Sequence, residues 1–170
     1  NYGKNSEYLI NTESLAGNNN KFIGHFLHGL KLKSYEFKRY KSKKDTRLIT
    51  INVFGKKNAV SNKDQIKFKA LEEGTFYARD LVSEPGNILH PDEYAKRLNS
   101  LKKFGLKVTI FDQKKLKKLG MHALLGVGQG SVRGSYLVSL EWNGARNNSK
   151  PLAFVGKGVC FDTGGYSLKP

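Results

Sequence analysis

The residues best suited to chemistry lie in the closing segment 154–170, FVGKGVCFDTGGYSLKP. Lys157 lies between two glycines, Asp162 follows five residues later, and Lys169 lies seven residues beyond Asp162. Glycines remove side-chain bulk, so a ligand or another stretch of backbone can approach closely. A carboxylate held in a glycine-rich turn suits a divalent cation, which prefers hard oxygen ligands. The lysines would supply positive charge, or an amine nitrogen if neutral. The pattern therefore indicates a metal site.

The same residue types also have an ordinary structural interpretation. Aspartate is a common turn residue, and lysine is usually a solvated surface group. On the residues alone, both interpretations of Asp162 and its neighbouring lysines stay open. Cys160 is the only cysteine, which excludes a disulfide within the chain and fits a reducing compartment. We expect Cys160 to be buried packing rather than a nucleophile, because no histidine neighbours it and strand alternation turns it away from Phe161.

The elements that must position these residues follow from hydrophobic periodicity. The apolar run 152–156 predicts a buried strand that delivers Lys157, and the apolar residues 159–161 should anchor the segment in a core. Further upstream, helical and strand patterns alternate, which predicts an α/β sheet covered by helices. The predicted elements are a helix opened by Pro91 and closed at Gly105, a strand at 106–111, a helix capped by Asp112 and stopped at Gly120, and a strand at 135–142.

The first half of the chain has a looser pattern. Residues 1–20 are polar with little pattern, whereas the apolar residues from Phe22 to Leu30 recur at helical spacing. The alternating stretch 46–55 predicts a strand. Ser61, with Asp64 in the first turn, predicts the start of a long helix that runs to about Val82.

Two further patterns carry weaker chemical signals. His25 and His28 lie three residues apart and could bind a metal, but we favour a partly solvated helix face because no third ligand is near. The stretch GVGQGS fails the dinucleotide fingerprint, since Ser131 occupies the position of the third glycine. It also follows a predicted helix and precedes a strand, which is the wrong context. We interpret it as a turn that lets backbone pack closely, and a role in shaping a pocket stays open.

Charge and hydropathy limit the class of protein. The formal net charge is +16, with 13 basic residues against three acidic ones between Lys31 and Lys69. Nucleic-acid binding is one explanation. We favour a solvated basic surface. Proteins that bind nucleic acids specifically use many arginines, whereas this chain is rich in lysine and asparagine throughout. No apolar run is long enough to predict a membrane span.

Several motifs together resemble the leucine aminopeptidases, the cytosol aminopeptidase family of metallopeptidases. VGKGVCFDTGGYSLKP closely resembles the signature that opens the catalytic site of this family. The resemblance spans roughly residues 22–170 and is strongest from 78 onward. Four other stretches support it: SYEFKRYK from Ser34, ARDLVSEPGNILHPDEYAK from Ala78, GMHALLGVGQGS from Gly120 and LEWNG from Leu140.

The resemblance implies an activity and a role for each motif residue. Members of the family release the N-terminal residue of a peptide, preferably leucine, with two divalent metal ions (Mn2+ or Zn2+) that activate water. By motif position, Lys157 and Asp162 resemble metal ligands, and Lys169 resembles the catalytic lysine that polarises the scissile carbonyl. Tyr166 departs from the family, which usually has an aliphatic residue there. The remaining metal-binding carboxylates and an arginine of the family should follow Lys169.

The resemblance also implies an organisation for the chain. We expect residues 1–60 to be the C-terminal portion of an N-terminal α/β domain and 61–84 a linker helix. Residues 85–170 should be the N-terminal portion of an α/β catalytic domain with a central mixed sheet. We expect a chain truncated at both ends and inactive by itself, from a cytoplasmic enzyme that forms a homo-hexamer. Its partners would be peptides with a free N-terminus. The alternatives are a nucleic-acid-binding protein and a non-catalytic relative.

Overall fold

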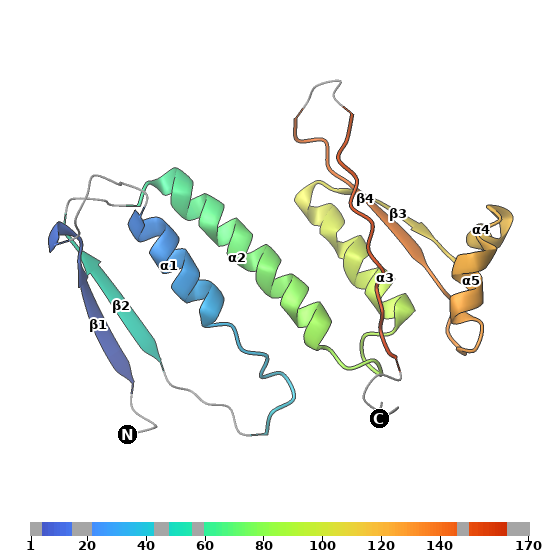
Figure 1. Ribbon diagram of the computed structural model, residues 1–170, viewed down its shortest axis with the longest axis horizontal. Coiled ribbons are helices and arrows are strands. Elements are labelled where there is room, and N and C mark those ends of the chain that lie inside the picture. Colours follow the sequence, from blue (N-terminus) through green and yellow to red (C-terminus); the bar gives the residue numbers. More distant parts are fainter. Residues whose placement is uncertain (1–4, 15–21, 43–47, 56–59, 146–149, 163–170) are drawn as a thin grey trace, which may run out of the picture. The chain divides into compact units, whose positions relative to one another are not determined.

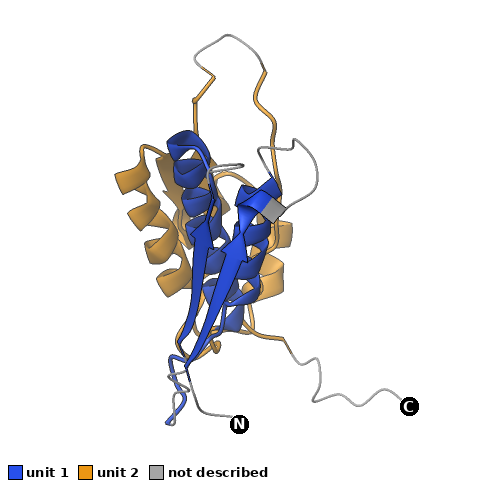
Figure 2. Cartoon of the chain, turned by 90° about the vertical axis from the view of Figure 1, so that its left-hand side faces the viewer, with its two compact units in different colours: residues 1–83 blue, residues 84–170 orange. Residues whose placement is uncertain are grey.

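The computed structural model describes residues 5–14, 22–42, 48–55, 60–145 and 150–162 (Figure 1). The chain is of the α/β class and divides into two compact units, unit 1 (Asn1–Ser83) and unit 2 (Glu84–Pro170), which Figure 2 shows in separate colours. The expected fold class is thereby confirmed. Each unit has its own small sheet with helices beside it, so each is described by itself.

Unit 1 combines a two-stranded parallel sheet with a pair of helices. Its elements are β1 (Ser6–Asn11), the 3-10 helix η1 (Thr12–Ser14), α1 (Phe22–Lys33), β2 (Ile49–Phe54) and α2 (Asn62–Ser83). The predicted helix at Phe22, the strand and the long helix are all confirmed. At the start of α2, the Ser61 hydroxyl accepts a hydrogen bond from the Asp64 backbone N–H at 3.1 Å and donates to the Asp64 carboxylate at 2.8 Å. This is the predicted cap, and it satisfies one of the free N–H groups of the first turn.

Strand β1 lies within residues 1–20, where the sequence shows little pattern and no strand was predicted. β1 runs parallel to β2 with Tyr8 opposite Ile51, and the Ser6 N–H donates to the Leu48 carbonyl at 3.0 Å. Most of its side chains are exposed. Because the strand has no buried face, its sequence does not need the alternation of apolar and polar residues by which a strand is predicted. The strand is created by backbone pairing with a segment some forty residues away, which local composition does not encode.

Helices α1 and α2 pack through a histidine and phenylalanine cluster. Phe68 of α2 is buried, with the His25 ring edge-on at 5.0 Å and the His28 ring stacked at 4.8 Å, both between centroids. His28 Nδ1 also lies 2.9 Å from the Glu72 carboxylate. The two histidines therefore contribute to helix packing, and no group of metal-binding side chains surrounds them in the described residues.

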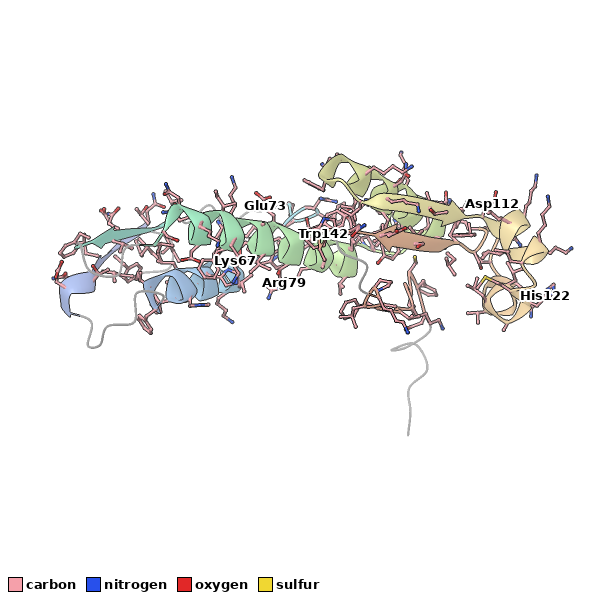
Figure 3. The ribbon with its side chains drawn as sticks, turned by 90° about the horizontal axis from the view of Figure 1, so that it is seen from above. Lys67, Glu73, Arg79, Asp112, His122 and Trp142 are labelled. Atoms are coloured by element: carbon pink, nitrogen blue, oxygen red, sulfur yellow. The ribbon has the colours of Figure 1, made fainter. Side chains whose placement is uncertain are left out.

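Exposed charged residues of both signs lie along α2. Lys67, Glu73 and Arg79 follow one another along the helix (Figure 3) and all are exposed. Arg79 also donates to the Leu32 carbonyl of α1 at 2.6 Å. Alternating charge along a helix is typical of a solvated surface.

Unit 2 contains a two-stranded antiparallel sheet with helices beside it. Val108 lies opposite Leu140 in this pair. The central mixed sheet of the catalytic domain stays a prediction, because the described residues of unit 2 contain this antiparallel pair alone. Leu89, Ala95, Val108 and Leu116 form its buried apolar core. The elements are α3 (Pro91–Asn99), the 3-10 helix η2 (Ser100–Phe104), β3 (Lys107–Phe111), α4 (Gln113–Lys118), α5 (His122–Gly128) and β4 (Leu137–Glu141).

The predicted helix ends of unit 2 are confirmed. Asp112, labelled in Figure 3, accepts a hydrogen bond from the Lys115 N–H at 2.9 Å and so caps α4. Gly105 and Gly120 end their helical segments with φ of 86° and 70°, a backbone region that glycine enters without steric cost. None of the helices described above combines the length and the apolar character that crossing a bilayer requires.

The strand predicted at 152–156 is wrong. The described residues 150–159 form no strand, and the side chain of Val155 is 99% exposed. Within the described portion of the chain, β4 pairs only with β3, so this apolar run has no ladder to join. Phe161 is 69% exposed, so the expected anchoring of 159–161 in a core is also wrong. An apolar run becomes a strand only where another backbone satisfies its hydrogen bonds.

Candidate active site

Two of the three residues predicted for the site lie within the described residues. Lys157 and Asp162 are both exposed and belong to the segment 156–162, here called the ligand segment. The Val159 N–H donates to the Lys157 carbonyl at 3.1 Å, which makes a three-residue turn centred on Gly158. The chain bends shortly afterwards, at Cys160. Lys169 and Tyr166 lie outside the described residues.

The ligand segment contacts helix α3 at Gly158. A Cβ atom at Gly158 would lie 2.7 Å from Cε1 and 3.3 Å from Cδ1 of Tyr94. Such a distance is too short for a real Cβ, so the tyrosine ring lies where an alanine side chain would be. Among the described residues, no atom lies within 4 Å of the Cβ position of Gly156, on the other side of Lys157. Within this part of the chain, a close contact requires glycine at position 158 but not at 156.

A second close contact joins the ligand segment to the loop before α3. A Cβ atom at Gly86 would lie 2.8 Å from the carbonyl oxygen of Cys160 and 3.3 Å from Cβ of Phe161. Gly86 follows Pro85, and a Pro-Gly pair is a common turn sequence. The contact with Cys160 adds a tertiary reason for glycine at this position. The loop and the ligand segment thus lie backbone against backbone.

The loop before α3 is tied to the helix by a buried ion pair. The Glu84 side chain is fully buried, and Arg97 Nη1 donates to its carboxylate at 3.1 Å. Arg97 Nε also donates to Glu93 at 3.1 Å. Burial lowers the pKa of Arg97, but the hydrogen bonds to Glu93 and Glu84 outweigh it and raise the pKa overall. The guanidinium thus stays charged and bridges the two carboxylates.

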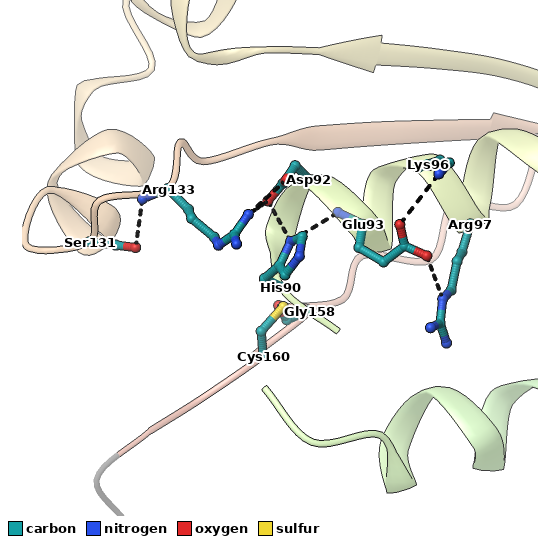
Figure 4. A network of polar contacts seen from close by, with 9 residues as sticks. All are labelled: His90, Asp92, Glu93, Lys96, Arg97, Ser131, Arg133, Gly158 and Cys160. Carbon is teal, nitrogen blue, oxygen red and sulfur yellow. Dashed lines mark hydrogen bonds and ion pairs between the residues drawn. The ribbon is translucent and has the colours of Figure 1, made fainter. Parts of the chain in front are cut away.

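A second polar network lies at the start of α3 (Figure 4). His90 is the N-cap residue, and its Nδ1 lies 2.5 Å from Asp92 Oδ1 and 3.3 Å from the backbone nitrogen of Glu93. One nitrogen cannot donate to the first and accept from the second, and the shorter contact favours an N–H that donates to Asp92. Arg133 Nη1 lies 3.0 Å from both carboxylate oxygens of Asp92.

This network holds the turn after α5 near α3. The Arg133 backbone N–H donates to the Ser131 hydroxyl at 3.1 Å, so the GVGQGS turn is linked through Arg133 to Asp92. A Cβ at Gly128 would overlap the Ser135 hydroxyl. The stretch begins inside α5, which ends at Gly128, and turns only at residues 129–131, so its interpretation as a turn is confirmed in part. Close packing of backbone is not seen at its glycines in the described residues.

The charge of Asp92 is stabilised by the network around it. Desolvation raises its pKa, but hydrogen bonds from backbone N–H, Arg133 and His90 outweigh that effect and hold the pKa below its usual value of 3.8. Because the folded-state pKa is lower than that of the unfolded chain, Asp92 stabilises the fold above about pH 4. This contribution is lost as the pH falls through the folded-state pKa.

Substituting Arg133→Gln is expected to raise the pKa of Asp92 toward its usual value, because the guanidinium charge is removed. The acid-unfolding midpoint should move to higher pH by the same linkage. The titration can be followed by carbon NMR of the Asp92 carboxyl. Lys107→Gln, which removes an exposed ion pair with Glu141, serves as the control and should leave the titration unchanged. An Asp92 pKa that is equal in wild type and Arg133→Gln would contradict the expectation.

Cys160 lies beside this network and is partly buried. Burial raises the pKa of its thiol, and the negative charge of Asp92 raises it further. The thiol contacts the Gly158 carbonyl at 3.7 Å. A raised pKa disfavours the reactive thiolate. The expectation that Cys160 is buried is met only in part, because its exposure is intermediate.

Asp162 and Lys157 carry donor atoms of types that a divalent cation can bind. Asp162 offers hard carboxylate oxygens and Lys157 an amine nitrogen. In the described ranges, no three side chains from His, Cys, Asp and Glu lie close enough to hold an ion together. The described ranges therefore contain no complete metal site of these residue types, and the roles of Lys157 and Asp162 stay predictions.

The supporting residues were missed when the sequence was considered alone. Tyr94, Glu84 and Arg97 look like an ordinary aromatic and two charged residues of a helical stretch. Two sequence features could have pointed to these residues: the glycine after Lys157 and the Glu-Pro-Gly sequence at 84–86. Neither feature indicates which residue elsewhere in the chain it contacts. Their partners lie elsewhere along the chain and are brought near only by folding.

Comparisons with known proteins point to one family. The sequence model of the cytosol aminopeptidase family, catalytic domain, matches residues 76–170. Curated proteins named "Probable cytosol aminopeptidase" are similar over 84% of this chain: one from Bradyrhizobium sp. is 46% identical over 151 residues, and one from Afipia carboxidovorans is 50% identical over 147. The chain spans 29% of the length of each of these two relatives.

A solved structure has a similar fold. The bottromycin maturation enzyme BotP, in complex with Mn, superimposes with a TM-score of 0.66 at 23% identity. The match covers 81% of this chain and 29% of the other. At this level of identity, the likeness establishes the fold alone.

Proposed function

This chain belongs to the cytosol aminopeptidase family, and we propose that the protein, as its gene encodes it, is a metal-dependent aminopeptidase. It would release N-terminal amino acids, preferably leucine, from peptides. The observation that carries the proposal is the family match over residues 76–170, which includes the Gly-Lys-Gly and Asp-Thr-Gly-Gly stretches around Lys157 and Asp162. The proposal extends to an activity because both stretches carry residue types that suit metal-assisted hydrolysis.

In this proposal, Asp162 and Lys157 hold a portion of a site for divalent ions, with Mn2+ or Zn2+ as the candidates. When bound, such ions supply Lewis-acid activation of water and of the scissile carbonyl. The carboxylate of Asp162 contributes a hard anionic ligand, and an ion can reach it from solvent because the side chain is exposed. Lys157 contributes its amine from the turn centred on Gly158.

Lys169 is proposed to be the catalytic lysine. An ammonium group directed at the carbonyl oxygen would stabilise the negative charge that develops there during attack by water. The proposal for Lys169 rests on its motif position, because it lies outside the described residues.

Several properties of the whole protein are proposed with the activity. They are a homo-hexameric assembly, a cytoplasmic location, and a division into three regions: an N-terminal domain segment (residues 1–60), a linker helix (61–84) and a catalytic-domain segment (85–170). The inactivity of the 170-residue chain by itself is proposed as well. It is supported by the described residues, in which no three His, Cys, Asp or Glu side chains lie close enough to hold an ion together.

The activity can be tested by assaying the protein as encoded with leucine p-nitroanilide and Mn2+. We expect turnover that EDTA abolishes and Mn2+ restores, because the chemistry depends on the ions. N-acetyl-leucine p-nitroanilide is the matched control and should not react, since it offers no free amine. The 170-residue chain should give no turnover above a metal-only blank. A protein that cleaves the acetylated substrate equally well, or that is indifferent to EDTA, would not be the proposed enzyme.

A further inference from the structure

An asparagine followed by a glycine comes shortly after strand β4. Asn143 and Gly144 are the one Asn-Gly pair among the 170 residues of the chain, and both are exposed. β4 ends at Glu141, and residues 142–144 belong to no helix or strand. Within the part of the chain that the structure describes, no hydrogen bond holds the Asn143 side chain or the Gly144 N–H. The pair is therefore free of the restraints that a regular element imposes on its backbone.

An asparagine before a glycine can react with its own backbone. The nitrogen of the glycine attacks the side-chain carbonyl carbon Cγ, and a cyclic succinimide forms as the Cγ–Nδ2 bond breaks and ammonia leaves with the N–H proton. Water then opens either carbonyl of the ring, which gives aspartate or its β-linked isomer isoaspartate. Glycine favours the attack, because it has no side chain to hinder the approach and its backbone rotates most freely. Asparagine is among the thermolabile residues of proteins for this reason.

A tertiary contact favours glycine at position 144. A Cβ atom there would overlap Cζ2 of Trp142 and would lie 2.5 Å from Cη2, so the indole ring occupies the place of a side chain. Trp142, labelled in Figure 3, is itself 75% exposed. An alanine at this position would have to displace the ring. The packing of Trp142 thus favours the same residue that makes Asn143 reactive.

Two other asparagines lie where the fold protects them. Asn99 precedes Ser100 at the end of α3, and the Ser100 N–H donates to backbone carbonyls of the last helical turn. Asn52 lies within β2 and is followed by the β-branched Val53, which is paired in the same ladder. Attack at either asparagine requires the backbone to leave its helix or its ladder first, which costs free energy. These two positions provide controls within the same molecule.

We propose that Asn143 is a site of spontaneous deamidation, which converts it through a succinimide with the Gly144 nitrogen into aspartate and isoaspartate. The reaction consumes water and releases ammonia, so it needs no other reactant, and it does not depend on the proposed aminopeptidase activity. It places a new carboxylate after the end of β4, close in sequence to Glu141. Isoaspartate also lengthens the backbone by one methylene group at that point.

The test incubates the folded protein, as encoded, in mildly alkaline heavy-oxygen water and then digests it in ordinary water. Tandem mass spectrometry measures the fraction of each asparagine that has gained a solvent oxygen. We expect the product at Asn143 to form about tenfold or more faster than at Asn99 or Asn52, whose N–H partners are hydrogen-bonded. In protein denatured with urea, Asn99 and Asn52 should react faster than in the folded protein, whereas Asn143 should change little.

Two variants test the route of the reaction. Asn143→Gln should remove the product at this position, and Gly144→Ala should slow its formation about tenfold or more, because the methyl group hinders the attacking nitrogen. Thermal midpoints show whether the variants are folded. A rate at Asn143 no higher than at Asn99 in the folded protein would overturn the inference. Equal rates in Gly144→Ala and wild type would also overturn it, as would aspartate formed without isoaspartate, since a succinimide opens to both.

Discussion

Asp162→Asn is expected to lower kcat/KM for leucine p-nitroanilide by about a thousandfold in the protein as encoded. The amide keeps the size and shape of the side chain but removes the negative charge that a divalent cation requires. Asp162 is exposed, so the substitution should leave the free energy of unfolding nearly unchanged. The expected result is therefore a loss of activity and of metal affinity without a loss of stability, measured by steady-state kinetics and thermal unfolding.

Glu141→Gln is the control for this experiment. It also changes an exposed carboxylate to an amide, at an ion pair with Lys107. It should leave kcat/KM within about twofold of wild type, because exposed ion pairs contribute little. Activity of Asp162→Asn close to that of Glu141→Gln would show that the carboxylate of residue 162 is not a metal ligand, and the assignment of the site would then be wrong.

Arg97→Met is expected to destabilise unit 2 by about 3 kcal/mol, since it leaves the fully buried carboxylate of Glu84 without its guanidinium partner. Methionine keeps much of the aliphatic length of arginine, so the loss reports the charge and the hydrogen bonds more than the packing. The free energy of unfolding can be measured by urea denaturation. Because the pair joins the loop with Gly86 to α3, the metal affinity should fall as well.

Lys107→Met is the matched control for Arg97→Met. It likewise replaces a cation paired with a glutamate, but its partners Lys107 and Glu141 are 74% and 61% exposed. We expect a change of at most about 1 kcal/mol, which is the usual limit for surface ion pairs. Equal effects of the two substitutions would mean that the buried ion pair at Glu84 has no special role in stability.

Local sequence patterns were sufficient to predict an element where its formation depends on its own residues. The cap at Ser61, the cap at Asp112 and the glycine stops at Gly105 and Gly120 were predicted and are confirmed. These features are local, because a side chain bonds to a backbone group three residues away, or a glycine adopts a left-handed φ. The long helix α2 was predicted for the same reason.

Local sequence patterns gave wrong or missing predictions where an element depends on a distant partner. β1 was missed because its pairing with β2 is made by backbone groups some forty residues apart. The opposite error occurred at 152–156, where an apolar run predicted a strand that has no partner in the described residues. Strand formation requires a neighbouring backbone, and the hydrophobicity of a segment does not reveal whether one is present.

The same distinction between local features and features that depend on a distant partner applies to the candidate site. The amino-acid sequence by itself determined the types, order and spacing of Lys157, Asp162 and Lys169, and hence the family and the chemistry that these residues suit. Only the tertiary structure decided that, among the described residues, Gly158 and not Gly156 has a close contact, made by the ring of Tyr94 sixty-four residues earlier. Ligand identity is a property of single residues, whereas their placement depends on packing between segments that meet only after the chain folds.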